Sequence, residues 1–168
     1  MHNYLSKFKK SSCKIKMANE GITNLFINNL LFKFSSIYKG CFSSDNFPKN
    51  LKQPFAIIIN LSKHDKPGTH FICIIENKKQ IFYFDSFGIN CFVPSICHFL
   101  FSKHKEIIQN KITIQHHSSL FCGFFCILFV LFMEKNEFNL QKFQNKFSSN
   151  LIKNDYLCIN EIKKELIV

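Results

Sequence analysis

The run from Leu120 to Met133 (LFCGFFCILFVLFM) is the feature that most constrains how this chain can fold. It is apolar throughout, yet it is shorter than the roughly 18 residues that a membrane-spanning helix needs. It follows the polar Ser118 and Ser119, which favours a helix buried in a protein core. A chain of 168 residues is long enough to bury such a core within one domain. We therefore predict a soluble globular protein that does not associate with membranes.

The cysteine content and the N-terminus indicate an intracellular protein. The N-terminal sequence MHNYLSKFKKSSCKIK is basic but has no apolar stretch of the kind found in signal peptides, so we expect no secretion. Eight cysteines are then predicted to stay reduced in a cytosolic or nuclear compartment, most of them as small buried hydrophobic residues. Because no CxxC pair occurs and Cys122 and Cys126 are spaced CxxxC, we predict neither a metal nor a small-molecule cofactor.

The positive charge behind the net charge of +11 comes from lysine, because the sequence contains no arginine. Lysine meets a phosphate as a point charge and lacks the fork with which arginine reads guanine, so any contact with DNA should be independent of sequence. An AT-rich coding sequence whose lysines cover solvated faces would explain the same charge without a ligand. The lysines considered for DNA binding are Lys7, Lys9, Lys10, Lys14, Lys16, Lys103 and Lys105.

Apolar periodicity predicts helices and strands on both sides of the apolar run. Residues 17–34 carry apolar side chains at three- and four-residue spacing, which predicts a core-docking helix. Residues 38–54 (YKGCFSSDNFPKNLKQP) contain one glycine and two prolines and are predicted to form a surface loop. The other predicted elements are central strands at 56–61, 70–76 and 80–85, a helix at 94–101, a strand-like segment at 111–115, a helix that follows Cys122 and an amphipathic tail.

The last two of the central strands are close enough in sequence to form a β-hairpin. In the register that pairs Glu76 with Lys79, residue numbers across the ladder sum to 155. His70 then falls directly opposite Asp85, and directly opposed side chains share a face with Cβ atoms about 5 Å apart. A slip of one residue would place the two on opposite faces, so this prediction depends on the turn.

A cysteine in the first turn of a helix has a physical reason to be reactive. Cys122 would face the positive end of the helix dipole and unpaired backbone N–H groups, which favour the thiolate. Gly123 would let a substrate carbonyl approach those N–H groups. His70 is the best placed histidine to exchange protons with the thiol, and Asp85 would fix its tautomer. Gln115, seven positions before the cysteine, could donate a side-chain N–H to an oxyanion.

Each of these residues taken singly also has an ordinary structural explanation. A buried cysteine usually packs, a histidine at a strand edge usually makes a surface hydrogen bond, and an aspartate before SFG is often a turn former. Their order along the chain, His, Asp, Gln and then Cys–Gly, is the one that a single acyl-transfer site would need.

This ordered pattern resembles the adenovirus-type maturation protease, adenain, and its relatives in polinton and adintovirus elements. The matching segments run in the family's order between residues 17 and 133, with the seven-residue gap from Gln to Cys preserved. The segments are YKGCFSSDNFP, AIIINL, GTHF, FYFDSFG and QHHSSLFCGFFCILF.

The resemblance implies an α+β fold related to papain-like cysteine proteases. In this fold a central mixed or antiparallel sheet is flanked by helices, and the nucleophile lies at the N-terminus of a buried helix. Phe71 stands where the family usually has tryptophan, and with Phe121 it is expected to line a narrow substrate cleft. The implied roles are nucleophile for Cys122, general base and acid for His70, orienting acid for Asp85, and oxyanion hole for Gln115 with the backbone of Cys122 and Gly123.

The implied function is a viral cysteine endopeptidase that cleaves capsid and core precursor proteins during virion maturation. It would act in the virion and in the host nucleus or cytoplasm. We expect a basic N-terminal segment at 1–16 and a single protease domain at 17–168. Adenovirus enzymes are activated by viral DNA and by a peptide that is tethered through a cysteine shortly before the glutamine. The matching stretch SKHKEIIQNKITIQ has no cysteine, so a disulfide-tethered peptide is not expected here.

Two other functions stay open on the sequence. Proteases that remove SUMO and related ubiquitin-like modifiers share the order His, Asp, Gln, Cys, but their common Asp–Cys–Gly signature is absent because Phe121 precedes Cys122. A basic DNA-binding, capsid-associated protein without catalysis would account for the charge but not for the co-occurrence of the four site residues. Covalent labelling of one cysteine by a thiol-directed probe would separate the two enzymes from the binding protein.

Overall fold

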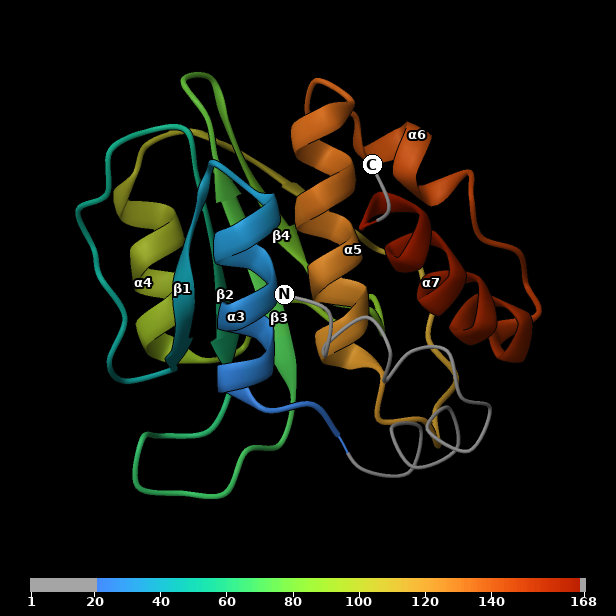
Figure 1. Cartoon of the computed structure of the whole chain (residues 1–168). Coiled ribbons are helices and arrows are strands. Elements are labelled where there is room, and N and C mark those ends of the chain that lie inside the picture. Colours follow the sequence, from blue (N-terminus) through green and yellow to red (C-terminus); the bar gives the residue numbers. More distant parts are fainter. Residues whose placement is uncertain (1–20, 167–168) are drawn as a thin grey trace.

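A five-stranded mixed sheet organises the fold, which we describe from a computed structural model of residues 21–166 (Figure 1). The strands lie side by side in chain order, with parallel pairs at the two edges and antiparallel pairs in the middle. They are β1 (Tyr38–Ser43), β2 (Phe55–Asn60), β3 (Phe71–Glu76), β4 (Gln80–Phe84) and β5 (Glu106–Gln109).

Helices cover both faces of the sheet, and the alternation of side chains along each strand divides the core in two. Ile57 and Ile59 belong to the layer under α4, whereas Ala56 and Ile58 belong to the layer under α3, α5, α6 and α7. Figure 1 shows this arrangement, with α5 lying along the sheet between α3 and α7. The helices are α3 (Asn24–Phe34), α4 (Pro94–Ser102), α5 (Cys122–Lys135), α6 (Leu140–Gln144) and α7 (Leu151–Glu165).

The apolar run forms α5, as its length predicted, and it is buried on every side. All residues from Gly123 to Met133 are buried, and the helix packs against β3, α3, α6 and α7. A helix that is apolar all round is stable only when it is enclosed in this way. Its centre is an aromatic cluster in which Phe129 stacks on Phe84 at 4.3 Å between ring centroids and meets Phe143 edge-on at 5.1 Å. Within residues 21–166 no helix is long and apolar enough to cross a membrane.

The predicted central strands and both predicted helices before the apolar run are confirmed. One edge strand, β1, was not predicted, and the other, β5, was predicted at the wrong residues. The predicted loop at 38–54 was wrong at its start, because its first six residues form β1. Gly40, which suggested a turn, instead sits at a register irregularity of β1 with φ of 141°. The predicted strand at 111–115 was also wrong. The neighbouring EIIQ pairs with β4 as β5, while the N–H groups of Ile114 and Gln115 bond the Ser86 carbonyl.

Part of the N-terminal prediction lies outside the described residues. This holds for the basic segment 1–16 and for the first residues of the helix expected at 17–34. Within the described chain that helix begins at Asn24, because the hydroxyl of Thr23 accepts a hydrogen bond from the N–H of Phe26 and caps it.

The β3–β4 hairpin is confirmed, but its register differs by two residues from the predicted one. Glu76 pairs with Ile81, so residue numbers across the ladder sum to 157. The reason is the turn, which lies one residue later than predicted: the N–H of Asn77 donates to the Gln80 carbonyl, and the side-chain oxygen of Asn77 accepts the N–H groups of Lys79 and Gln80. A shift of two keeps every side chain on its face. The predicted direct opposition of His70 and Asp85 was therefore wrong, and the two meet diagonally beyond the last paired residues.

The enclosure of α5 predicts that its core aromatics carry much of the stability. Phe129→Ala should lower the free energy of unfolding by about 3–5 kcal/mol, because it leaves a cavity inside the Phe84–Phe143 cluster. Phe101→Ala is the matched control, because that ring is 71% exposed and its loss should change stability by no more than about 0.5 kcal/mol. Urea unfolding of both variants measures the difference, and equal losses would contradict this account.

Candidate functional site

Cys122 is the first residue of α5, and its thiol is partly exposed. The residue before it, Phe121, has no side-chain oxygen, and within the described chain no side chain caps this helix and no acidic residue lies in its first turn. The first N–H groups of the helix therefore keep their partial positive charge at the end where the sulfur lies. The position predicted from sequence is thus the one that the structure has.

His70 and Asp85 meet at the edge of the sheet where β3 begins and β4 has just ended. His70 Nε2 lies 3.0 Å from Asp85 Oδ1, and the same oxygen accepts the N–H of Phe87 at 2.8 Å. The Asp85 side chain is fully buried and that of His70 is 15% exposed. With Nε2 bonded to the carboxylate, the imidazole has its Nδ1 free to interact with the Cys122 side chain.

The surroundings of His70 favour its charged form. Burial lowers the pKa of this imidazole, but hydrogen bonding to Asp85 and to the Cys122 side chain, together with the negative charge of both groups when ionised, outweighs burial and raises the pKa from 6.5 to about 9. At neutral pH the ring is therefore an imidazolium, which can pair with a thiolate on one side and with a carboxylate on the other.

An aromatic stack, which sequence reasoning missed, holds the imidazole in place. The His70 ring stacks on Phe87 at 5.1 Å between centroids and 27° between planes. Phe87 stacks in turn on His117 at 6.1 Å and 14°. Because the N–H of Phe87 also bonds Asp85, this one residue touches both partners of the His–Asp pair. The available signal was its place directly after Asp85 and Ser86 in FYFDSFG.

Gln115 is buried, and both ends of its side-chain amide are held. Its Oε1 accepts the hydroxyl of Ser86 at 2.6 Å, and its Nε2 donates to the carbonyl of Ser119 at 2.7 Å. The segment 115–119 is thereby folded back on itself immediately before α5. Neither serine was predicted to contact Gln115. Ser86 lies 29 residues before it, and no local pattern indicates such a contact.

Two buried polar residues outside the predicted set support these loops. Asn110 Nδ2 donates to the backbone carbonyl of Asp85 at 2.7 Å. Asp155, on α7, accepts the N–H of His116 at 3.2 Å, and burial raises the pKa of this carboxyl. The C-terminal helix, whose role the sequence left open, therefore braces the segment that carries Gln115.

Gly123 and Phe71 are more closely packed than the sequence suggested. A Cβ on Gly123 would lie 2.6 Å from Cγ1 of Ile22 and 3.2 Å from the Phe71 ring, so the absent side chain makes room for packing rather than for an open approach. Phe71 is only 8% exposed and lies in the core, which leaves little of it to line a cleft. Phe121 is partly exposed and packs edge-on against Phe124 at 5.5 Å.

Two of the lysines considered for DNA binding are engaged with a buried acid. Lys105 Nζ lies 2.8 Å from Glu76 Oε1, and Lys103 Nζ lies 3.7 Å from Glu76 Oε2. Both lysine side chains are largely covered, so the structure gives them a partner within the chain instead of a free face toward phosphate. The other five, Lys7, Lys9, Lys10, Lys14 and Lys16, lie outside the described residues.

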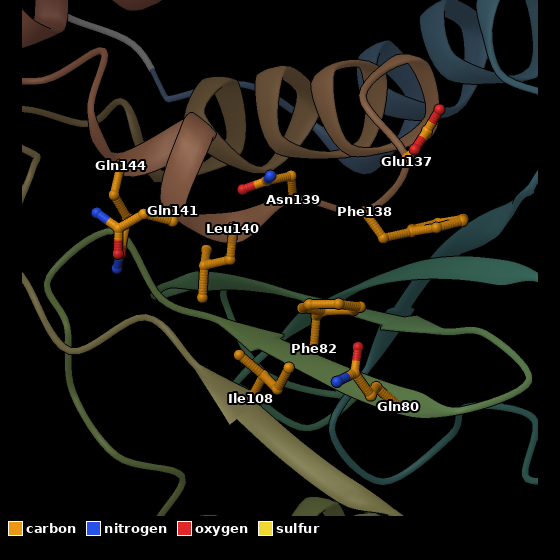
Figure 2. Close-up of a pocket in the computed structure, with 9 residues that line it drawn as sticks. All are labelled: Gln80, Phe82, Ile108, Glu137, Phe138, Asn139, Leu140, Gln141 and Gln144. Atoms are coloured by element: carbon orange, nitrogen blue, oxygen red, sulfur yellow. The ribbon is translucent and has the colours of Figure 1, made fainter.

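A cavity of about 410 Å³ lies at another part of the molecule, between strands β4 and β5 and the turn from α5 to α6 (Figure 2). In Figure 2 Phe82 and Ile108 rise from the sheet toward Phe138 and Leu140 on the facing segment. None of the predicted site residues within 21–166 lines it. Its lining residues are Gln80, Phe82, Ile108, Glu137, Phe138, Asn139, Leu140, Gln141 and Gln144.

The raised pKa of His70 makes stability depend on pH. Because the folded pKa of about 9 lies above the ordinary 6.5, the protonated ring stabilises the fold fully below about pH 6.5, and this contribution is lost as pH rises through about 9. In Asp85→Asn the pKa of His70 should fall and the loss of stability at alkaline pH should shrink. NMR titration of the His70 ring and urea unfolding at both ends of this range measure the two effects.

The control for this experiment is the exposed pair of His64 and Asp45, whose Nδ1 and Oδ2 atoms are 2.9 Å apart. Asp45→Asn should leave the pH dependence of stability almost unchanged, because solvent screens an exposed pair. A measured pKa near 6.5 for His70 in the wild type would show that Asp85 and Cys122 do not stabilise its charged form.

Comparison with known proteins identifies no close relative. No protein-family model matches the sequence, and no curated protein matches it. Among solved structures, the chain is similar to the "1.7 Angstroms structure of ChlaDub1 from Chlamydia Trachomatis", with a TM-score of 0.42 and 15% sequence identity. The match covers 65% of this chain and 60% of that one, so the chain spans about three fifths of the structure that it matches. A similarity this distant does not show the family to which the chain belongs.

Proposed function

We propose that this chain is a cysteine protease in which Cys122 is the nucleophile. One observation carries the proposal: a thiol at the uncapped N-terminus of α5 lies beside an imidazole that is bonded to a fully buried carboxylate. If the thiol, the imidazole and the carboxylate only packed in the core, there would be no reason for the three to lie together. The fixed amide of Gln115 in the segment before α5 supplies a fourth group that such chemistry uses.

In the proposed acylation step the Cys122 thiolate attacks the carbonyl carbon of a peptide bond. The carbonyl oxygen becomes an oxyanion, which the backbone N–H of Cys122 and the free Nε2 hydrogen of Gln115 stabilise. The His70 imidazolium then donates its proton to the leaving amine while the C–N bond breaks, which leaves a thioester on Cys122. Asp85 keeps the imidazole oriented and offsets its positive charge throughout.

In the proposed deacylation step neutral His70 takes a proton from a water molecule, which attacks the thioester carbonyl. Collapse of the second oxyanion intermediate releases the carboxylic acid and returns the thiolate, with the proton left on His70. The resting ion pair is thereby restored. A histidine with a pKa of about 9 fits this cycle, because its charged form is the one that starts each turnover.

Within this class we propose a viral endopeptidase that cleaves capsid and core precursor proteins during virion maturation. The resemblance of the ordered sequence segments to the adenain family supports it. Removal of ubiquitin-like modifiers is the second candidate, supported by the same order of His70, Asp85, Gln115 and Cys122 along the chain. Phe121 stands where that second group commonly has aspartate, which favours the first candidate.

Activation by DNA and by a peptide remains part of this proposal. Of the lysines considered for DNA binding, Lys103 and Lys105 are paired with Glu76, so we propose that those near the N-terminus make the contact. Such contacts would be with phosphate only, so binding would ignore sequence and weaken by about 0.9 log units per log unit of salt for each phosphate neutralised.

The identity of the nucleophile can be tested with a matched pair of cysteines on one helix. Cys122→Ser should lower kcat by more than about a thousand-fold, because it removes the thiolate with little change in volume. Cys126, one turn further along α5, is fully buried and donates its S–H to the Phe71 carbonyl at 3.4 Å. Cys126→Ser should keep kcat within about a factor of three of the wild type. Equal effects of the two substitutions at equal folded concentration would refute the assignment.

The two candidate substrates can be separated by a panel of fluorogenic compounds. We expect hydrolysis of internally quenched peptides with glycine near the cleavage point, the preference that the resemblance to adenain implies. We expect at most weak release of a dye from the C-terminus of ubiquitin or SUMO. The reverse preference would favour the second candidate. Failure of every compound, together with failure of a peptide aldehyde to protect Cys122 from alkylation, would remove the protease proposal as a whole.

A further inference from the structure

Ser86 connects the His–Asp pair to the proposed oxyanion donor. It follows Asp85 directly and is fully buried. Its backbone carbonyl accepts the N–H groups of Ile114 at 2.9 Å and Gln115 at 3.2 Å, and its hydroxyl donates to Gln115 Oε1 at 2.6 Å. Three hydrogen bonds thus join one residue to the segment that carries the glutamine. None of them is part of a helix or of the sheet.

The chemistry of its two partners sets the orientation of the Gln115 amide. The Ser119 carbonyl can only accept a hydrogen bond, so the amide atom 2.7 Å from it has to be the nitrogen. The amide oxygen therefore faces Ser86, whose hydroxyl has to donate. One of the two Nε2 hydrogens goes to Ser119, and the second is left for another acceptor.

We propose that Ser86 is a positioning residue that keeps the free N–H of Gln115 directed at the oxyanion. Without the hydroxyl, the buried Oε1 would lose its only donor among the described residues, and the amide would rotate to find another. The aspartate that orients His70 and the serine that orients Gln115 are neighbours in the chain, so one short segment sets both halves of the site. This inference rests on the proposed protease function.

The kinetic test uses Ser86→Ala, Gln115→Ala and the double variant. Ser86→Ala should lower kcat about ten-fold with little change in KM. Gln115→Ala, which removes the donor itself, should lower kcat about a hundred-fold or more. In the Gln115→Ala background, Ser86→Ala should have no further effect, because the two residues act as one unit. Ser95→Ala is the matched control, because its hydroxyl donates to the Ser44 carbonyl at 2.6 Å from α4 and its loss should not change kcat.

Two further measurements separate positioning from a general loss of structure. Alkylation of Cys122 by iodoacetamide, followed by mass spectrometry, needs a thiolate but no oxyanion hole, so its rate should be the same in Ser86→Ala and in the wild type. The side-chain amide signals of Gln115 in NMR spectra should shift and exchange faster with solvent in Ser86→Ala, and they should not do so in Ser95→Ala.

The outcomes also distinguish this inference from the proposed function. Unchanged Gln115 amide signals in Ser86→Ala would overturn the positioning role whether or not the protein is a protease. Multiplicative effects of the two substitutions on kcat, or a slower alkylation of Cys122, would overturn it too and make Ser86 merely structural. Altered amide signals in a protein whose wild type hydrolyses no substrate would support the positioning of Gln115 and remove the protease function instead.

Discussion

The sheet and three helices enclose α5 on all sides, and this enclosure positions the other elements. A helix with no polar face is stable only where neighbours cover it all round, and here the sheet, α3, α6 and α7 do so. Enclosure also fixes the helix in space, because aromatic contacts such as Phe84–Phe129 allow little sliding. A rigid helix aims its N-terminal N–H groups in one direction. The cysteine at its head gains from this a constant electrostatic environment.

Around that helix end, the polar groups that matter are placed by loops instead of by regular elements. Asp85 and Ser86 come just after β4, His70 just before β3, and Gln115 after β5. Irregular backbone of this kind has to find its hydrogen bonds elsewhere, and Asn110 and Asp155 supply some of them from buried positions. Such hydrogen bonds hold the side chains of these loops in place, which a site built on irregular backbone requires.

The charges of the site balance one another in a way that a protease would use. A buried carboxylate beside an imidazole favours the imidazolium, which places a positive charge near the N-terminus of α5, where Cys122 lies. The same pairing stabilises the folded protein at neutral pH. The proposed catalytic arrangement and the stability of the fold therefore draw on the same interactions.

Elements with a strong local sequence signal could be predicted before the structure was known. The length and composition of the apolar run predicted α5, and the β-branched runs predicted β2 to β4. The order of His70, Asp85, Gln115 and Cys122 along the chain predicted a single site built from these side chains. The other features depend on contacts that form only in the folded chain. The edge strands β1 and β5 exist because they pair with β2 and β4, although their own sequences carry a glycine and charged residues. Ser86 contacts Gln115, Phe87 stacks on His70, and Asp155 bonds the N–H of His116. Lys103 and Lys105 pair with Glu76. These contacts join residues distant in the chain, and no local pattern encodes them.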